Sequence, residues 1–121
     1  MNAPPETVAW LQRYYALLDS ARVREALDEF LSRDCTIRLG NGPPVDFVTE
    51  ARRMGTLVKG VRHELLTVLE GDDGTLACEL KITYVKHDGT EVMLPGALFA
   101  RIADGRFVEQ RAYVDQTPLT S

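Results

Sequence analysis

The sequence predicts an α+β domain in which three N-terminal helices pack against one side of a curved, mostly antiparallel sheet. Two observations lead to this fold class. Four alternating apolar stretches follow one another in the second half of the chain, and glycine-containing turns join them. The first half has helical apolar spacing instead, interrupted by one short strand-like stretch. The expected element order is α-α-β-α-β-β-β-β, in a single domain that spans residues 1–121.

The first two helices are expected to form a helical hairpin. Residues 6–18 follow Pro4 and Pro5, and proline is tolerated at a helix start. This helix carries two apolar stripes, so its buried face is wide, as for a helix that lies in a concave sheet. The stripes consist of Val8, Leu11, Tyr15 and Leu18, and of Trp10, Tyr14 and Leu17. Ser20 is expected to cap the second helix, residues 21–31.

A short strand and a third helix complete the first half of the chain. Residues 35–39 alternate as a strand, and residues 40–44 form a loop rich in glycine and proline. Asp46 is expected to cap a helix that runs to about residue 59, with Gly60 as its stop.

The long strands of the sheet are expected at residues 61–70, 75–86, 91–102 and 106–115. Their turns contain glycine because hairpin turns require the positive φ that glycine accepts. The second of these strands has one clean apolar face, which predicts that one side of the sheet packs on the helices. That face consists of Leu76, Cys78, Leu80, Ile82 and Tyr84.

Strict alternation along the last strand divides its side chains into two faces. The side chains that would face the helices are Val108, Gln110, Ala112 and Val114. Those that would face outward are Phe107, Glu109, Arg111 and Tyr113. Aromatic side chains on the outer face would leave an apolar patch in water. The pattern therefore favours a homodimer that forms symmetrically through the outer sheet face.

Composition and charge exclude several function classes. The net charge is −4 and no basic patch stands out, which argues against nucleic acid or an anionic membrane as a partner. No apolar run is long enough for a membrane span, and no leader pattern precedes the first helix, so a soluble, cytoplasmic protein is expected. Cys35 and Cys78 are expected to be small buried side chains. The sequence contains no spacing typical of metal ligands and no cofactor-binding motif.

Three segments together are similar to one known family. They are Tyr-Tyr-Ala-Leu-Leu at residues 14–18 leading into residues 23–31, Arg-His-Glu-Leu at residues 62–65, and residues 104–115. In that order they resemble the opening helical hairpin, the first long strand and the closing strand of the SnoaL-like branch of the nuclear transport factor 2 superfamily. The resemblance covers residues 6–119 and implies a curved-sheet cone with one deep pocket. It implies no single activity, because this fold hosts isomerases, cyclases, hydrolases, dehydratases and binding domains.

The carboxylates that catalyse reactions in better-known members of the superfamily are missing from the matching positions. Residues 12–14 are similar to the steroid isomerase segment that carries an oxyanion-hole tyrosine. The base position of those enzymes falls at Leu39, and the acid position falls at Ala97 or Leu98. Limonene epoxide hydrolases and SnoaL-type polyketide cyclases use an inward Asp on the last strand, and the epoxide hydrolase motif places Ala112 there. Steroid-type isomerisation is therefore not expected, and any acid/base chemistry needs another group.

Three residues remain as candidate catalytic groups. Tyr14 lies on the stripe that would face the pocket, where it is either a core aromatic or a hydrogen-bond donor to a ligand oxygen. His63 shares a face with Leu65 and Leu69, and is either a strand-end residue or a group that titrates near neutral pH. Asp115 ends the last strand and points outward unless the strand bulges. The residues expected to line the pocket are Trp10, Met54, Leu80, Tyr84, Gln110 and Ala112.

Two functional hypotheses stay open at this point. In the first, the cone pocket binds an apolar, carbonyl-bearing small molecule, and Tyr14 and His63 act on it by acid/base chemistry of the isomerase or cyclase type. In the second, the chain is a non-catalytic dimerisation or accessory domain whose cavity is small or filled. The apolar concavity favours the first hypothesis, and the missing inward carboxylates favour the second.

Overall fold

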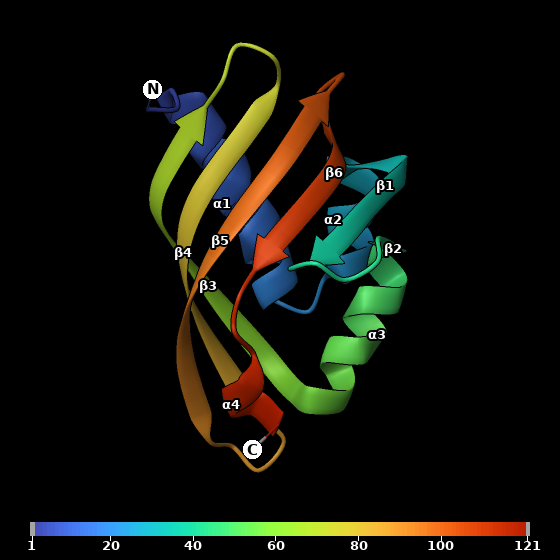
Figure 1. Ribbon diagram of the computed structural model, residues 1–121, viewed down its shortest axis with the longest axis vertical. Helices are drawn as coiled ribbons and strands as arrows, with labels where there is room; N and C mark the ends of the chain where they lie inside the picture. The colour runs from blue at the N-terminus through green and yellow to red at the C-terminus, as the bar shows by residue number, and fades with distance from the viewer. Residues whose placement is uncertain (1, 121) are drawn as a thin grey trace.

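The computed structural model describes residues 2–120. Within them, helices and strands follow the order expected from the sequence, with two additions. The elements are α1 (Pro5–Asp19), α2 (Val23–Phe30), β1 (Leu31–Leu39), β2 (Val45–Asp46), α3 (Phe47–Leu57), β3 (Val58–Glu70), β4 (Thr75–Lys86), β5 (Glu91–Ala103), β6 (Arg106–Tyr113) and α4 (Thr117–Thr120) (Figure 1). The additions are β2 and α4, which are too short for a periodic sequence pattern to reveal.

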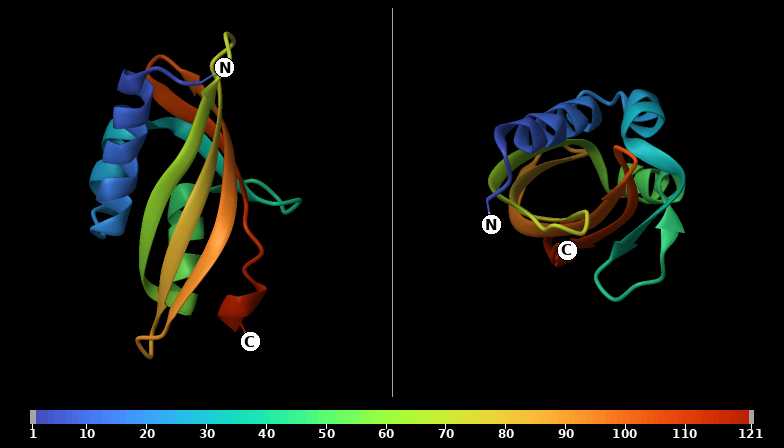
Figure 2. Two further views of the ribbon diagram at one scale, coloured as in Figure 1. Left: turned by 90° about the vertical axis from the view of Figure 1, so that its left-hand side faces the viewer. Right: turned by 90° about the horizontal axis from the view of Figure 1, so that it is seen from above.

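The strands form one curved sheet in the order β2-β1-β6-β5-β4-β3. β1 runs parallel to β6, and the other neighbouring strands are antiparallel. The helices α1 and α2 cover the open side of the curve, and α3 lies beside them (Figure 2). The predicted α+β class, with helices on one side of a mostly antiparallel sheet, is confirmed.

The hairpin turns have the backbone conformation that their glycines predict. The φ angle is 84° at Gly74, 90° at Gly89 and 75° at Gly105. Asp104 also has a positive φ of 53°, so the β5–β6 turn has the two consecutive positive values of a type I′ turn. A side chain at Gly74 is excluded by space as well, because a Cβ there would lie 2.5 Å from the carbonyl oxygen of Ile102.

One predicted helix boundary is confirmed and two are wrong. Asp46 caps α3, since its carboxylate accepts a hydrogen bond from the N–H of Thr49 at 2.7 Å. Ser20 does not cap α2, because it ends α1 and its hydroxyl donates back to the carbonyl of Ala16. Gly60 does not stop α3, because the chain is already extended before it and Gly60 lies within β3.

A β-bulge in β6 reverses part of its predicted face assignment. Ile102 pairs with Phe107 whereas Arg101 pairs with Glu109, so Val108 is an extra residue. The bulge turns the side chain of Phe107 into the core, where it is fully buried. The prediction that Phe107 faces outward is therefore wrong, because strict alternation fails wherever a strand gains one unpaired residue.

Phe107 completes an aromatic cluster between α1, α2 and the sheet. Its ring centroid lies 4.8 Å from that of Trp10 and 5.0 Å from that of Tyr14. Phe30 of α2 packs against the same two rings of α1. This cluster fills the part of the concave face that lies under the middle of α1.

A second bulge changes the faces of β3. Leu65 pairs with Leu80 and Thr67 pairs with Glu79, so Leu66 is the extra residue. After the bulge, Leu69 is exposed. His63 therefore shares a face with Leu65, as expected, and the expectation that Leu69 lies on the same face is wrong.

The bulge in β6 can be tested by stability. We expect Phe107→Ala to lower the free energy of unfolding by about 3–5 kcal/mol, the cost of deleting a large buried ring. Val108→Ala should cost much less, because Val108 is only partly buried. Urea unfolding of the two variants measures the difference. The opposite order would mean that β6 has no bulge and that Val108 fills the core.

Candidate functional site

The concave face has an upper end at the β5–β6 turn and a lower end at the β4–β5 turn (Figure 1). Tyr14 belongs to the upper end, because its hydroxyl accepts a hydrogen bond from Nε2 of Gln110 in β6 at 3.0 Å. Its ring is buried against Phe30 and Phe107, and burial raises the pKa of its hydroxyl. Tyr14 and Gln110 are thus partners of each other in a packed part of the core.

His63 lies lower on the same face and is held by Asp19. Along β3, His63 pairs with Ile82, whose side chain is buried on the concave face. Nδ1 of His63 lies 2.6 Å from Oδ1 of Asp19, and the backbone N–H of His63 donates to Oδ2 at 2.8 Å. Asp19 ends α1 and β3 is an edge strand, so one carboxylate joins the end of the helix to the edge of the sheet.

The Asp19 carboxylate decides which nitrogen of a neutral His63 ring carries the proton. An ionised carboxylate only accepts hydrogen bonds, so Nδ1 holds the proton and Nε2 keeps its lone pair. Nε2 makes no hydrogen bond with any residue in the range 2–120. The His63 side chain is 13% exposed and that of Asp19 is 21% exposed. A shielded imidazole with a free basic nitrogen and a carboxylate behind it is suited to general-base chemistry.

Tyr15 lies between Tyr14 and His63, and its hydroxyl has no partner. Its ring centroid is 4.4 Å from that of His63 and 5.0 Å from that of Tyr14. Only 7% of Tyr15 is exposed, yet its hydroxyl forms no hydrogen bond within the described part of the chain. Burial, with a smaller effect of neighbouring Cys78, Tyr14 and Asp19, raises its pKa well above the usual value. Tyr15 therefore keeps its proton and can donate it to a ligand oxygen.

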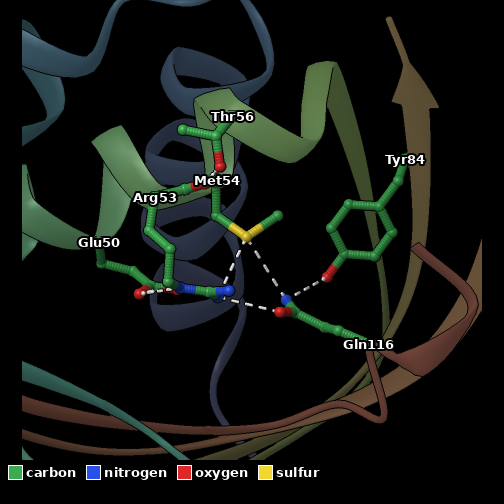
Figure 3. A network of polar contacts seen from close by, with 6 residues as sticks. All are labelled: Glu50, Arg53, Met54, Thr56, Tyr84 and Gln116. Carbon is green, nitrogen blue, oxygen red and sulfur yellow. Dashed lines mark hydrogen bonds and ion pairs between the residues drawn. The ribbon is translucent and has the colours of Figure 1, made fainter. Parts of the chain in front are cut away.

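A polar network occupies the lower end of the concave face (Figure 3). Nε and Nη2 of Arg53 in α3 donate to the two carboxylate oxygens of Glu50 at 2.9 and 2.7 Å. Nη2 of Arg53 also donates to Oε1 of Gln116 at 2.9 Å. Nε2 of Gln116 donates in turn to the Tyr84 hydroxyl at 3.4 Å and to Sδ of Met54 at 3.5 Å. The network connects α3, β4 and the segment that follows β6.

Strand register places this network next to His63. Tyr84 pairs with Val61, and Ile82 pairs with His63. Tyr84 and His63 are therefore one diagonal step apart on the same face of two neighbouring strands, a separation that side chains of this length can span. Tyr15, His63 and Tyr84 together define the candidate site, and Asp19 and Arg53 support it from α1 and α3.

Some of the other residues predicted from the sequence to line the pocket or to act in catalysis lie in this site, and others lie outside it. Leu80 is buried on the concave face of β4, and Ala112 pairs with the buried Leu98. Trp10 packs in the upper aromatic cluster, away from the lower network. Asp115 is exposed, and its carboxylate accepts hydrogen bonds from the N–H and hydroxyl of Thr117, which lower its pKa. We therefore leave Trp10 and Asp115 out of the site.

The candidate site and the polar network that supports it include five residues that are not predicted from the sequence as site residues. Tyr15 and Asp19 are four residues apart on α1, so they lie on one helix face and could have been noted as a pair. Glu50 and Arg53 have helical spacing too, which is common on solvated helix surfaces and carries little information. A fifth residue, Gln116, follows the sheet in an irregular segment, and no sequence pattern places it near α3.

Two surface hollows lie outside this network of side chains, although His63 borders the second of them. A groove of about 330 Å³ is bordered by α2, β1 and the start of α3, and includes Leu31, Cys35 and Phe47. A depression of about 260 Å³ on the outer side of β3, β4 and β5 includes Lys81 and Met93. Cys35 and Cys78 are buried free thiols, as expected. Within residues 2–120, no three His, Cys, Asp or Glu side chains are grouped closely enough to hold a metal ion.

Comparison with known proteins identifies the family. The sequence model of the SnoaL-like domain matches residues 11–110. This chain belongs to the SnoaL-like domain family. No protein of curated function matches the SnoaL-like chain in sequence. Among residues 2–120, none of its helices has the length and apolar character that crossing a bilayer requires.

Solved structures share the fold of this SnoaL-like protein at low sequence identity. TerC, co-crystallised with polyporic acid, superimposes with a TM-score of 0.79 at 14% identity, covering 94% of this chain and 98% of TerC. AclR from Streptomyces galilaeus, a proposed hydroxylase, has a TM-score of 0.77 at 16% identity, covering 97% and 80%. A proposed SnoaL-like polyketide cyclase from Jannaschia sp. CCS1 has a TM-score of 0.76 at 15% identity, covering 99% and 94%. At these identities the likeness concerns the fold alone.

The different surroundings of the two neighbouring tyrosines predict different effects on stability. Tyr14→Phe should lower the free energy of unfolding by about 1–3 kcal/mol, because the buried Gln110 amide loses its acceptor. Tyr15→Phe should leave stability within about 0.5 kcal/mol of the parent, because no hydrogen bond is lost. Urea unfolding of both variants tests this pair. An equal loss for Tyr15→Phe would mean that its hydroxyl has a partner in solution.

Proposed function

We propose that this SnoaL-like protein binds a small apolar molecule with a carbonyl group and catalyses proton transfer on it, as an isomerase or cyclase does. One observation carries the proposal. The ring of His63, whose Nε2 makes no hydrogen bond within residues 2–120, packs against the ring of Tyr15, whose hydroxyl makes none there either. A base next to a hydrogen-bond donor is what enolisation of a carbonyl compound requires.

The proposed reaction begins with the carbon next to the carbonyl group. Nε2 of His63 removes a proton from that carbon, and the electrons of the C–H bond form the carbon–carbon double bond of an enolate. The carbonyl oxygen takes up the negative charge and accepts a hydrogen bond from the Tyr15 hydroxyl. Asp19 stabilises the imidazolium ion. Return of the proton to another carbon isomerises the molecule, whereas attack of the enolate on a second carbonyl closes a ring.

This assignment replaces Tyr14 with Tyr15 as the donor and keeps His63 as the base. Tyr14 is tied to Gln110 in the packed upper core, whereas Tyr15 contacts the His63 ring directly. The neighbouring structures support a ligand site in this fold, since TerC was crystallised with polyporic acid. Leu80, Met54 and Tyr84 would supply the apolar walls around the ligand.

A non-catalytic accessory domain is the second candidate function. The observation that favours it is the aromatic cluster of Trp10, Tyr14, Phe30 and Phe107, which fills the upper part of the concave face. A cone that is packed along its whole length would bind no ligand. Both candidates are compatible with a homodimer.

We further propose a homodimer through the outer sheet face. Met93, Phe99 and Tyr113 expose 58%, 40% and 40% of their surfaces there, and the rings of Phe99 and Tyr113 contact edge to face. Charges of both signs surround them, among them Glu79 and Lys81. A face with an apolar centre and both signs of charge is self-complementary across a two-fold axis. The cytoplasmic location expected from the sequence stays a prediction.

Proton exchange on a ketone tests the proposed catalysis without knowledge of the natural substrate. We expect the protein to accelerate deuterium exchange at the carbons next to the carbonyl of 2-tetralone, followed by proton NMR in deuterated water. His63→Gln should reduce this acceleration by about 10²–10⁴ because the base is lost. Tyr15→Phe should reduce it by about 10²–10³ because the enolate oxygen loses its donor.

His87→Gln is the matched control, because His87 is an exposed histidine of the β4–β5 turn whose ring, within residues 2–120, hydrogen-bonds only to the carbonyl of Gly55. Exchange that does not depend on His63 would contradict the catalytic assignment. If the protein neither binds nor exchanges the ketone, the accessory-domain function is the better account.

Disruption of the outer face tests the homodimer. Phe99→Glu should raise the dimer dissociation constant at least about tenfold, because an unpaired carboxylate would be buried in an apolar contact. Analytical ultracentrifugation over a concentration series measures this constant. Val48→Glu is the control, since Val48 is equally exposed but lies on α3. A monomeric parent protein, or equal effects of both substitutions, would contradict this interface.

A further inference from the structure

The side-chain amide of Gln116 lies at the lower end of the candidate site, between polar groups of α3 and β4. Its side-chain amide oxygen accepts a hydrogen bond from Nη2 of Arg53 at 2.9 Å. Its amide nitrogen has only long contacts, at 3.4 Å to the Tyr84 hydroxyl and 3.5 Å to Sδ of Met54. Figure 3 shows the amide of Gln116 held between α3 on one side and Tyr84 on the other. One firm and two weak contacts hold this amide, so a ligand group has little to displace.

Glu50 already balances the positive charge of Arg53. This restricts the kind of ligand group that can bind beside Arg53 in place of Gln116. Glu50 accepts two hydrogen bonds from the guanidinium, and its side chain is only 15% exposed. A second carboxylate near Arg53 would face the charge of Glu50 at close range. A neutral carbonyl oxygen would only replace the amide oxygen of Gln116, which is itself neutral. The chemistry of the position therefore favours a ketone, quinone or amide oxygen over a carboxylate.

The segment that carries Gln116 is short and weakly fastened. Between β6 and residue 120, only the single turn α4 is regular, and Leu119 is its one buried side chain. Asp115 and Thr117 hydrogen-bond to each other, and the carbonyl of Thr117 accepts a hydrogen bond from Thr120 of the same segment. Figure 1 shows this segment crossing the lower end of the sheet beside α3. Movement of residues 115–120 would expose Arg53 and Tyr84 together without disturbing the sheet.

We infer that Arg53 and Tyr84 form a subsite for a neutral carbonyl oxygen of the ligand, and that Gln116 is a self-ligand that occupies this subsite until the ligand displaces it. The inference rests on the proposed function, because the ligand is the same apolar carbonyl compound. Nη2 of Arg53 and the Tyr84 hydroxyl would donate to one carbonyl oxygen. Tyr84 lies one diagonal step from His63, so a ligand fixed here extends toward the base.

Calorimetric titration with two naphthalene compounds of similar size tests this inference. The probes are 2-acetonaphthone, a neutral ketone, and 2-naphthoate, a carboxylate. Gln116→Ala should tighten binding of the ketone about two- to tenfold, because the competing amide is gone. Tyr84→Phe should weaken it about two- to tenfold, and Arg53→Met should weaken it further. Gln12→Ala, at an exposed position of α1, is the matched control and should change nothing.

The outcomes separate this inference from the proposed function. If His63-dependent exchange of 2-tetralone is present but ketone affinity is the same in the parent, Gln116→Ala and Tyr84→Phe, the subsite is wrong and the proposed function stands. Naphthoate binding as tightly as the ketone to Gln116→Ala would also overturn the subsite. If no variant binds the ketone or exchanges tetralone, both are wrong. Arg53→Met also leaves Glu50 without its partner. If that variant does not fold, the Tyr84→Phe result alone decides whether the subsite exists.

Discussion

The carboxylate of Asp19 joins the end of α1 to the edge strand β3 through two hydrogen bonds to one residue. One oxygen accepts from the backbone of His63, and the other contacts its ring. An edge strand has backbone groups without a neighbouring strand, and Asp19 satisfies one of them from a helix end. The same contact orients the imidazole toward the concave face. Fold and candidate chemistry thus depend on one side chain, and a carboxylate suits this position because each of its two oxygens can accept one of the bonds.

The concave face divides into a tightly packed aromatic upper part and a polar lower part. In the upper part, aromatic rings fill the curve, and the one polar pair, Tyr14 with Gln110, is satisfied internally. Farther down, Tyr15 and His63 keep unpartnered polar atoms, and Arg53 reaches Tyr84 only through Gln116. Polar atoms that have no partner in the protein can hydrogen-bond a ligand, and a few such atoms beside an apolar core are typical of a binding site.

Much of the fold could be predicted because local rules decide it. The glycines in the hairpin turns, the cap at Asp46 and the alternation along β4 each depend on nearby residues, and the structure follows them. Apart from the two helix boundaries at Ser20 and Gly60, the errors occur where one inserted residue changes a strand's faces. The bulges at Leu66 and Val108 have no local sequence signature, since they adjust strand curvature to the helices packed inside it.

By itself, the sequence determined the element order, the hairpin turns and a curved sheet covered by helices, because hydrophobic periodicity and glycine conformation act over a few residues. It also brought His63 forward as a candidate. Only the tertiary structure decided which tyrosine has a free hydroxyl, which carboxylate stands behind His63, and that Gln116 reaches Arg53. Along the sequence, Asp19 and His63 are 44 positions apart, and Arg53 and Gln116 are 63 positions apart. Contacts at such separations depend on strand register and on bulges, which the pattern of a single segment does not contain.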